Sequence, residues 1–257
     1  MNKKINTDNP CPCRSGKKYK DCCGKTDPSG LVDAYKDLST GDPVLDGYWY
    51  LIQILMAYME AKLQFDPDGP ELEKNIEDFE KMFSPGEEKG VSDSLFCSWL
   101  LFDLRYGKEA LSVAERFMEE NEAYGKLPPD GQEQIEIMSE SYATFYQVLG
   151  LKRDSIEMLE LGTGAVWKVR RVNEPFEKEA AAGDIWFVRL FGGVADAYIF
   201  TPPYIYPPEA KEDLTDLIKK ITDGCIDEAE KNIPRALFFM EVCKYTLPDM
   251  LDFILAD

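Results

Sequence analysis

The chain has 257 residues, of which 44% are hydrophobic, and a formal net charge of −19 at pH 7. This composition is sufficient for a packed core and argues against global disorder. The longest apolar stretch, 49–59, is shorter than the roughly 18 residues of a membrane span, and the N-terminus lacks the apolar region of a secretory signal. We therefore expect a cytoplasmic protein.

Charge is distributed unevenly along the chain. Residues 1–27 contain seven basic and three acidic residues, whereas residues 28–257, here called the body, contain 22 basic and 45 acidic residues. The first segment therefore carries +4 and the body −23. We expect the body to repel nucleic acid and anionic membranes, and residues 1–27 to attract acidic partners.

The sequence contains seven cysteines and no histidine. The absence of histidine removes the commonest general base and the commonest nitrogen ligand for metals. Any zinc site in this chain must therefore be built from thiolates, with or without a carboxylate.

Four cysteines lie close together near the N-terminus: Cys11, Cys13, Cys22 and Cys23. Two such pairs, joined by a loop of eight residues, can surround Zn²⁺ with four thiolates. The alternatives are disulfides, which a reducing compartment disfavours, and an unfolded tail with chance cysteines. A segment this short cannot fold by hydrophobic burial alone, so a bound metal would have to supply its folding free energy.

The run Cys-Pro-Cys-x-Ser-Gly-Lys-Lys-Tyr-Lys-x-Cys-Cys-Gly resembles the SEC-C motif, the zinc-binding tail of the translocation ATPase SecA. The motif also occurs as an appendage on many small bacterial proteins. The resemblance implies one structural zinc ion, with Cys11, Cys13, Cys22 and Cys23 as its ligands. Arg14 stands where the family usually has glycine, which affects the local turn and not the ligand set.

The resemblance also implies a protein partner, because the tail of SecA docks the acidic chaperone SecB and contacts the ribosome. The residues that it assigns to partner binding lie in the loop between the cysteine pairs and just after the second pair: Arg14, Lys17, Lys18, Tyr19, Lys20 and Lys25. The alternative is a solvated loop in which Tyr19 packs on the zinc lobe.

After a linker at 27–30, the body begins with a helical pattern. Apolar residues from Leu45 to Leu63 recur at intervals of three and four, which predicts a helix over 44–63 with its apolar stripe in the core. Prolines and glycines delimit the helices that follow. We predict these at 70–83, 93–105, 107–123 and 130–148.

The hydrophobic period changes near Gly150. Segments rich in Val, Ile, Trp, Phe and Tyr predict four or five short antiparallel strands, arranged as a compact sheet or a small barrel. We predict them at 155–161, 165–171, 184–190 and 195–201. Helical patterns return at 209–225 and 227–245.

The predicted fold class is therefore α+β, with a small N-terminal zinc module and a mainly helical domain that contains an inserted antiparallel β unit. The expected division is a zinc module at 1–27, a helical region at 28–150, a β unit at 151–206 and C-terminal helices at 207–257. The run 96–103, followed by the β segment, resembles a region of uncharacterised SEC-C-bearing bacterial proteins, which have no assigned activity.

Several features of the body have a plain structural interpretation. The acidic run 66–71 lacks the spacing of a calcium loop and is expected to connect two helices. Gly162-Thr163-Gly164 is expected to form a turn between strands. Without histidine, no Cys–His catalytic pair is available. We expect buried, unreactive thiols at Cys97, Cys225 and Cys243.

Aromatic residues of the β segment are expected to form its core: Trp167, Trp186, Phe187, Phe191 and Tyr198. The alternative is a nucleic-acid-binding platform, because four basic residues lie nearby in the sequence. These are Lys168, Arg170, Arg171 and Arg189.

The sequence therefore favours a non-catalytic cytosolic adaptor that docks a protein partner through its zinc segment. One alternative is a nucleic-acid-binding regulator that uses the zinc segment and the basic β segment. The other is an enzyme of unknown type in the acidic body. No membrane span is expected.

Overall fold

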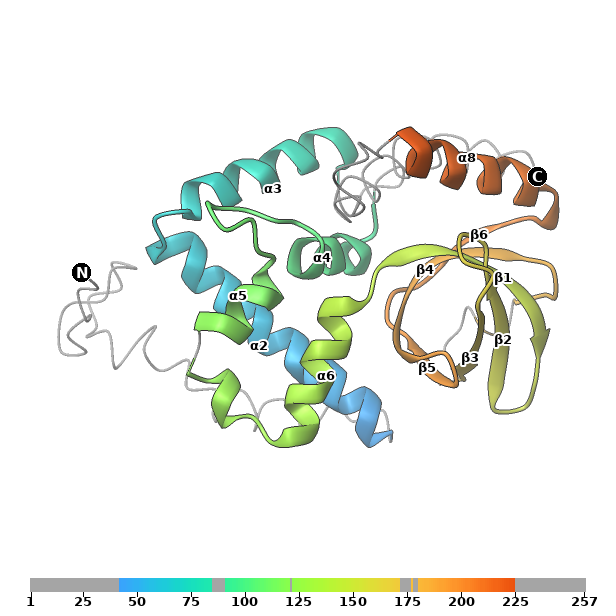
Figure 1. Cartoon of the computed structure of the whole chain (residues 1–257), viewed down its shortest axis with the longest axis horizontal. Helices are drawn as coiled ribbons and strands as arrows, with labels where there is room; N and C mark the ends of the chain where they lie inside the picture. Colours follow the sequence, from blue (N-terminus) through green and yellow to red (C-terminus); the bar gives the residue numbers. More distant parts are fainter. Residues whose placement is uncertain (1–41, 85–90, 121, 172–176, 178–179, 225–257) are drawn as a thin grey trace.

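The computed structural model describes residues 42–84, 91–120, 122–171, 177 and 180–224. A layer of helices, α2 to α6, lies beside a small β-barrel, and α8 runs along the barrel near the C-terminal end of the described chain (Figure 1). The predicted α+β class is confirmed for these residues.

Three of the predicted helices are present with nearly the expected bounds: α2 (Pro43–Phe65), α3 (Gly69–Phe83) and α4 (Asp93–Phe102). Asp42 caps α2, because its carboxylate accepts hydrogen bonds from the backbone N–H groups of Val44 and Leu45. Ser92 caps α4, because its hydroxyl accepts a hydrogen bond from the backbone N–H of Leu95. The apolar stripe predicted for the first helix is only partly in the core: Leu45, Ile52 and Met59 are buried, whereas Trp49 is exposed.

The helix predicted over 107–123 is wrong in its first part, since α5 spans Val113–Glu120. Ser112 and Glu115 form a capping box: the Glu115 N–H donates to the Ser112 hydroxyl and the Ser112 N–H to the Glu115 carboxylate. Gly107 and Ala110 both have positive φ angles, of 72° and 50°, which a helix excludes. A single 3₁₀ turn, η4 (Tyr124–Lys126), follows α5.

The helix predicted over 130–148 is correct only for residues 130–140, little more than half of it. Helix α6 spans Pro129–Glu140, and strand β1 (Ala143–Leu151) begins after two intervening residues. Strand β1 pairs with β2 on one side and with β4 on the other. These two partners satisfy its backbone groups, so tertiary pairing overrides the apparent helical continuation.

The strands form a closed barrel in the order β1-β2-β3-β5-β4, with β4 pairing back to β1. Their bounds are β2 (Ser155–Glu160), β3 (Val166–Arg170), β4 (Ile185–Gly193), β5 (Asp196–Ile199) and β6 (Tyr204–Tyr206). Strand β6 pairs with the first half of β4. The expectation of a purely antiparallel unit is wrong, because β3 and β5 pair in parallel through Val169 and Ala197.

The two faces of strand β4 contribute to two different cores. Trp186, Val188 and Leu190 point into the barrel, where they belong to its interior cluster. Phe187 and Phe191 point outward and pack in the larger cluster with the helices. The barrel is therefore fixed to the helical layer by an apolar outer face.

The last described elements are the 3₁₀ turn η5 (Pro208–Ala210) and helix α8 (Lys211–Gly224). Leu214, Ile218 and Ile221 of α8 are buried in the larger cluster. This agrees with the helix predicted over 209–225. The helix predicted over 227–245 lies outside the described residues, as does the zinc module.

Candidate functional site

The acidic loop between α2 and α3 is an ion-paired connection between helices. The Lys62 ammonium lies 2.7 Å from a carboxylate oxygen of Asp66, and Arg116 lies 3.3 Å from Asp68. Glu71 accepts a hydrogen bond from the backbone N–H of Gly107 at 3.2 Å. These carboxylates already have protein partners, which confirms the connecting-loop interpretation.

Arg116 is the centre of this polar cluster, and its side chain is 3% exposed. It donates to the carbonyl of Tyr106 at 2.8 Å and to Glu120 at 3.2 Å, and its guanidinium lies 4.5 Å from the centre of the Tyr106 ring. Lys62 also pairs with Glu120. The cluster therefore joins α2, α5 and their connecting loops, a structural role.

The expectation that the aromatic residues of the β segment form its core is confirmed only in part. Trp186 lies in the barrel interior with Trp167 packed against it, whereas Phe187, Phe191 and Tyr198 belong to the cluster shared with the helices. Trp186, Phe187, Phe191 and Tyr198 are buried, and Trp167 alone is half-buried. An open stacking platform for bases requires exposed ring faces, which the four buried rings do not provide.

The basic residues named with that platform are mostly paired. Arg189 is completely buried against Asp103, and Arg170 donates to Asp196 at 2.7 Å. Arg171 pairs with Glu177 at 3.2 Å. Lys168 is exposed on β3. The four residues therefore do not present one basic surface, and the specific support for a nucleic-acid interface is lost.

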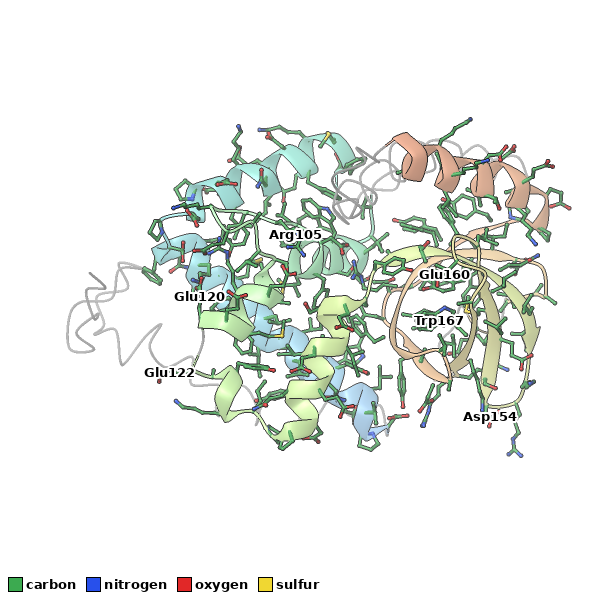
Figure 2. The ribbon with its side chains drawn as sticks, in the orientation of Figure 1. Arg105, Glu120, Glu122, Asp154, Glu160 and Trp167 are labelled. Carbon is green, nitrogen blue, oxygen red and sulfur yellow. The ribbon has the colours of Figure 1, made fainter. Side chains whose placement is uncertain are left out.

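A small pocket lies where the end of α6 meets the barrel. It measures about 180 Å³, and its lining residues are Ile137, Glu140, Ser141, Tyr142, Tyr146, Trp167, Leu190 and Gly192. Behind two of these aromatic residues lies Glu160 at the end of β2, 3% exposed. Figure 2 shows Glu160 beside Trp167 at the barrel. We call this the barrel pocket.

Glu160 holds two walls of the barrel pocket in place. Its carboxylate accepts a hydrogen bond from the Tyr142 hydroxyl at 2.5 Å and another from the Trp167 indole N–H at 3.0 Å. Sequence reasoning did not identify Tyr142 or Glu160. No local pattern signals the contact, because pairing among β1, β2 and β3 brings the three residues together.

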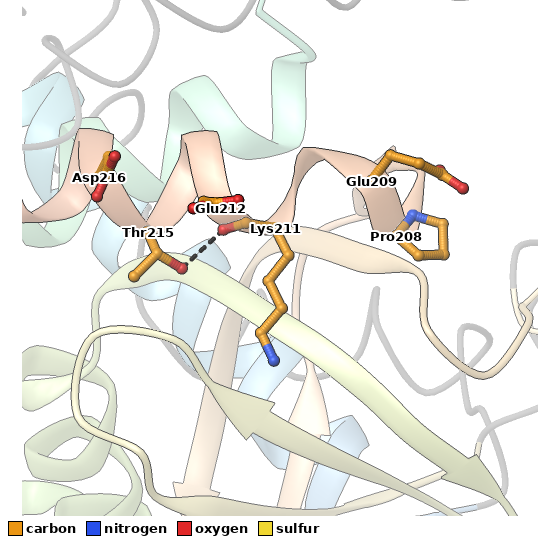
Figure 3. Close-up of a pocket in the computed structure, with 6 residues that line it drawn as sticks. All are labelled: Pro208, Glu209, Lys211, Glu212, Thr215 and Asp216. Carbon is orange, nitrogen blue, oxygen red and sulfur yellow. Dashed lines mark hydrogen bonds between the residues drawn. The ribbon is translucent and has the colours of Figure 1, made fainter.

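A shallower depression runs along the start of α8 (Figure 3). Glu209, Glu212 and Asp216 give it an acidic rim, and its lining side chains are all exposed. Lys211 donates to the side-chain oxygen of Gln147 at 2.8 Å, and Thr215 donates to the Lys211 carbonyl at 2.7 Å. These contacts stabilise the helix start and do not build an enclosed site.

The described residues contain no group of three or more Cys, Asp or Glu side chains placed to hold a metal ion. Cys97 on α4 is a free, half-buried thiol, and burial raises its pKa, with Asp93 adding to the shift. This agrees with the unreactive thiol expected there. Cys225 and Cys243 lie outside the described residues. Among the described helices, none combines the length and the apolar character that a membrane crossing requires.

All the residues predicted for the zinc site and for partner binding lie in residues 1–41, outside the described part. The zinc prediction therefore depends on the chemistry of its donors. Four cysteines and no histidine give an all-thiolate set, which suits tetrahedral Zn²⁺. Comparison with known proteins supports the same segment: residues 9–25 match the family described as "SEC-C motif". The chain carries a SEC-C motif.

Two curated relatives share this segment, and both are the protein translocase subunit SecA. That of Campylobacter curvus (strain 525.92) is 73% identical over 26 residues, which are 10% of this chain and 3% of the relative. That of Campylobacter fetus subsp. fetus (strain 82-40) is 69% identical over 32 residues, 12% of this chain and 4% of the relative. The similarity therefore covers a very small part of either relative. No solved structure matches the chain.

Proposed function

We propose that this protein is a zinc-binding, non-catalytic cytoplasmic adaptor whose SEC-C segment docks a protein partner. The SEC-C match at residues 9–25 carries the proposal. By resemblance, the partner is an acidic chaperone such as SecB, a component of the translocation machinery, or the ribosome. Both curated relatives with the segment are protein translocase subunits.

The chemistry of the cysteine set supports a structural zinc and no catalysis at the metal. Cys11, Cys13, Cys22 and Cys23 would fill the four positions of a tetrahedron and leave no site for water or substrate. Zinc would fold the short segment, and a reducing cytoplasm would keep the thiols available as ligands.

The charge difference along the chain supports docking through residues 1–27. Their +4 charge contrasts with −23 on the rest of the chain. Four zinc-bound thiolates around Zn²⁺ would reduce the charge of the segment by about two, so it would remain basic. Lys17, Lys18 and Lys20 lie between the cysteine pairs, where zinc binding would present them together. An acidic partner would be attracted to this loop at low salt.

The proposal is tested by measuring the binding of the full chain to purified SecB and to ribosomes. The test variant replaces Lys17, Lys18 and Lys20 with glutamate. The matched control makes the same charge change at three exposed lysines of the body, Lys108, Lys126 and Lys219. A third variant, Cys11→Ser, removes a predicted zinc ligand.

We expect salt-sensitive binding to one of the two partners. The loop variant and Cys11→Ser should weaken this binding by at least about tenfold, whereas the body control should not. The docking proposal fails if neither partner binds the wild-type chain, or if loop and control variants bind alike.

A further inference from the structure

The barrel pocket has the walls of a site for a cation. Three aromatic side chains line it: Tyr142 directly before β1, Tyr146 in β1 and Trp167 in β3. The rings of Tyr146 and Trp167 meet edge to face, with centroids 6.0 Å apart and planes at 86°. Aromatic faces carry negative electrostatic potential and attract ammonium and guanidinium groups.

Glu160 places a negative charge behind these rings. Glu160 is 3% exposed, and its carboxylate is held by two neutral donors, the Tyr142 hydroxyl and the Trp167 indole N–H. Within the described part of the chain it forms no ion pair. A buried carboxylate without a cation is costly, so a positive ligand in the adjacent pocket would stabilise it.

Among the residues that the structure describes, the other charged groups around the pocket leave it negative. Arg189 reaches the pocket-lining residue Ser141, to whose carbonyl it donates at 2.8 Å, but its charge is balanced by Asp103. Glu140 is exposed at the rim. The pKa of the Tyr146 hydroxyl is well above its ordinary value, because of burial first and then the negative charge of Glu160.

We propose that the barrel pocket binds a small organic cation, an alkylammonium or guanidinium group. Its volume of about 180 Å³ is suited to such a group, since a cavity of about 150 Å³ accommodates benzene. Three aromatic side chains and a single carboxylate, that of Glu140, line the pocket, which favours an organic cation over a metal ion that needs several oxygen ligands. Glu160 acts as a positioning residue for both ring walls and as the source of charge.

This site is independent of the SEC-C segment and would give the body a binding activity of its own. The ligand group has two sources, a free amine or the side chain of a peptide. Their shared chemistry is a cationic head that fits between Tyr142 and Trp167. Titration with choline and methylguanidine tests the free form, and a short neutral peptide with one central arginine tests the side-chain form.

The experiment follows the indole N–H resonance of Trp167 in the full chain by NMR during each titration. We expect saturable shifts with at least one cationic probe. The control ligand is 3,3-dimethylbutan-1-ol, the uncharged carbon analogue of choline, which should bind at least about tenfold more weakly. Saturation by methylguanidine or choline identifies a free amine site, and saturation by the peptide alone identifies a side-chain site.

Variants separate the pocket from other aromatic surfaces. Trp167→Ala should weaken binding at least about tenfold, measured by calorimetry, and Glu160→Gln should weaken it while retaining the size of the side chain. Trp49→Ala is the matched control, because Trp49 is 38% exposed on α2 and does not line the pocket. If Glu160→Gln fails to fold, Tyr142→Phe replaces it as the test variant, because it removes only the hydroxyl that donates to Glu160.

The proposal is overturned if no probe saturates, if the neutral analogue binds as tightly as choline, or if Trp167→Ala and Trp49→Ala have equal effects. Removal of residues 1–27 should leave cation binding unchanged. Failure of partner docking and failure of the barrel pocket are therefore distinguishable.

Discussion

Arg189 of strand β4 and Asp103 at the end of helix α4 form an ion pair that is almost completely removed from solvent, with side chains 0% and 1% exposed. Arg189 also donates to the carbonyl of Ser141, directly after α6. One side chain thus joins two helices to the barrel. It lies between Phe187 and Phe191 in the alternation of β4, on a face that is otherwise apolar.

We expect Arg189→Met to lower the free energy of unfolding by about 3–5 kcal/mol, because it leaves the Asp103 carboxylate buried without its partner. The double variant with Asp103→Leu should recover much of this loss. Urea denaturation of the full chain measures both. Arg105→Met is the control, since the Arg105–Glu115 pair lies at the surface and should contribute less than about 1 kcal/mol. Equal effects of the two arginine variants would contradict a buried ion pair.

Glycine is required at position 192, near the end of β4, where this strand pairs closely with β5. The φ angle of Gly192 is +109°, and a Cβ atom there would lie 2.4 Å from the Asp196 carbonyl oxygen. We expect Gly192→Ala to lower the free energy of unfolding by about 1–3 kcal/mol, because the backbone would be strained and the added methyl group would clash with Asp196. Thermal denaturation measures this loss. Gly193→Ala is the matched control, because no atom lies within 4 Å of its added methyl group. A control variant as unstable as Gly192→Ala would refute this explanation.

Stability should fall at alkaline pH. Burial raises the pKa of Tyr48 to about 12, and burial with the hydrogen bond to Asp42 raises that of Tyr198 to about 12. Between pH 10 and 12 these hydroxyls ionise in the unfolded chain but stay protonated in the folded one. The folded state then binds more protons, so the free energy of unfolding decreases as pH rises through this range.

Urea denaturation at pH 8 and at pH 11 measures the alkaline effect. Tyr48→Phe removes one of the two groups and should make the decrease shallower. The same decrease in wild type and in the Tyr48→Phe, Tyr198→Phe double variant would exclude these tyrosines as its cause.

Removal of zinc should leave the body folded, since the described helices and barrel bury their own apolar side chains in two clusters. We expect one zinc ion per chain by elemental analysis of protein purified without chelator. Cys11→Ser and Cys22→Ser should each lose it, while Cys97→Ser on α4 should retain it. A chelator should remove the metal without shifting the main thermal transition of the body. Full zinc content in both ligand variants would disprove the assignment.

Local sequence patterns were sufficient for α2, α3 and α4, because apolar spacing and the prolines and glycines between helices act within a few positions. They failed at residues 143–148. There Phe145 and Tyr146 are compatible with a helix face or a strand, and pairing with both β2 and β4 decides for the strand.

The donors predicted for zinc could be named from the sequence because all four lie within 13 residues, and a metal that folds so short a segment needs no distant contact. The described pairs Arg189–Asp103 and Trp167–Glu160 had no such local signal. Arg189 is a basic residue in an aromatic strand and resembled part of a nucleic-acid surface. Closure of the barrel and packing against α4 bury Arg189 next to Asp103, which is 86 positions away in the sequence. The arginine therefore forms an internal ion pair and is not part of a basic surface.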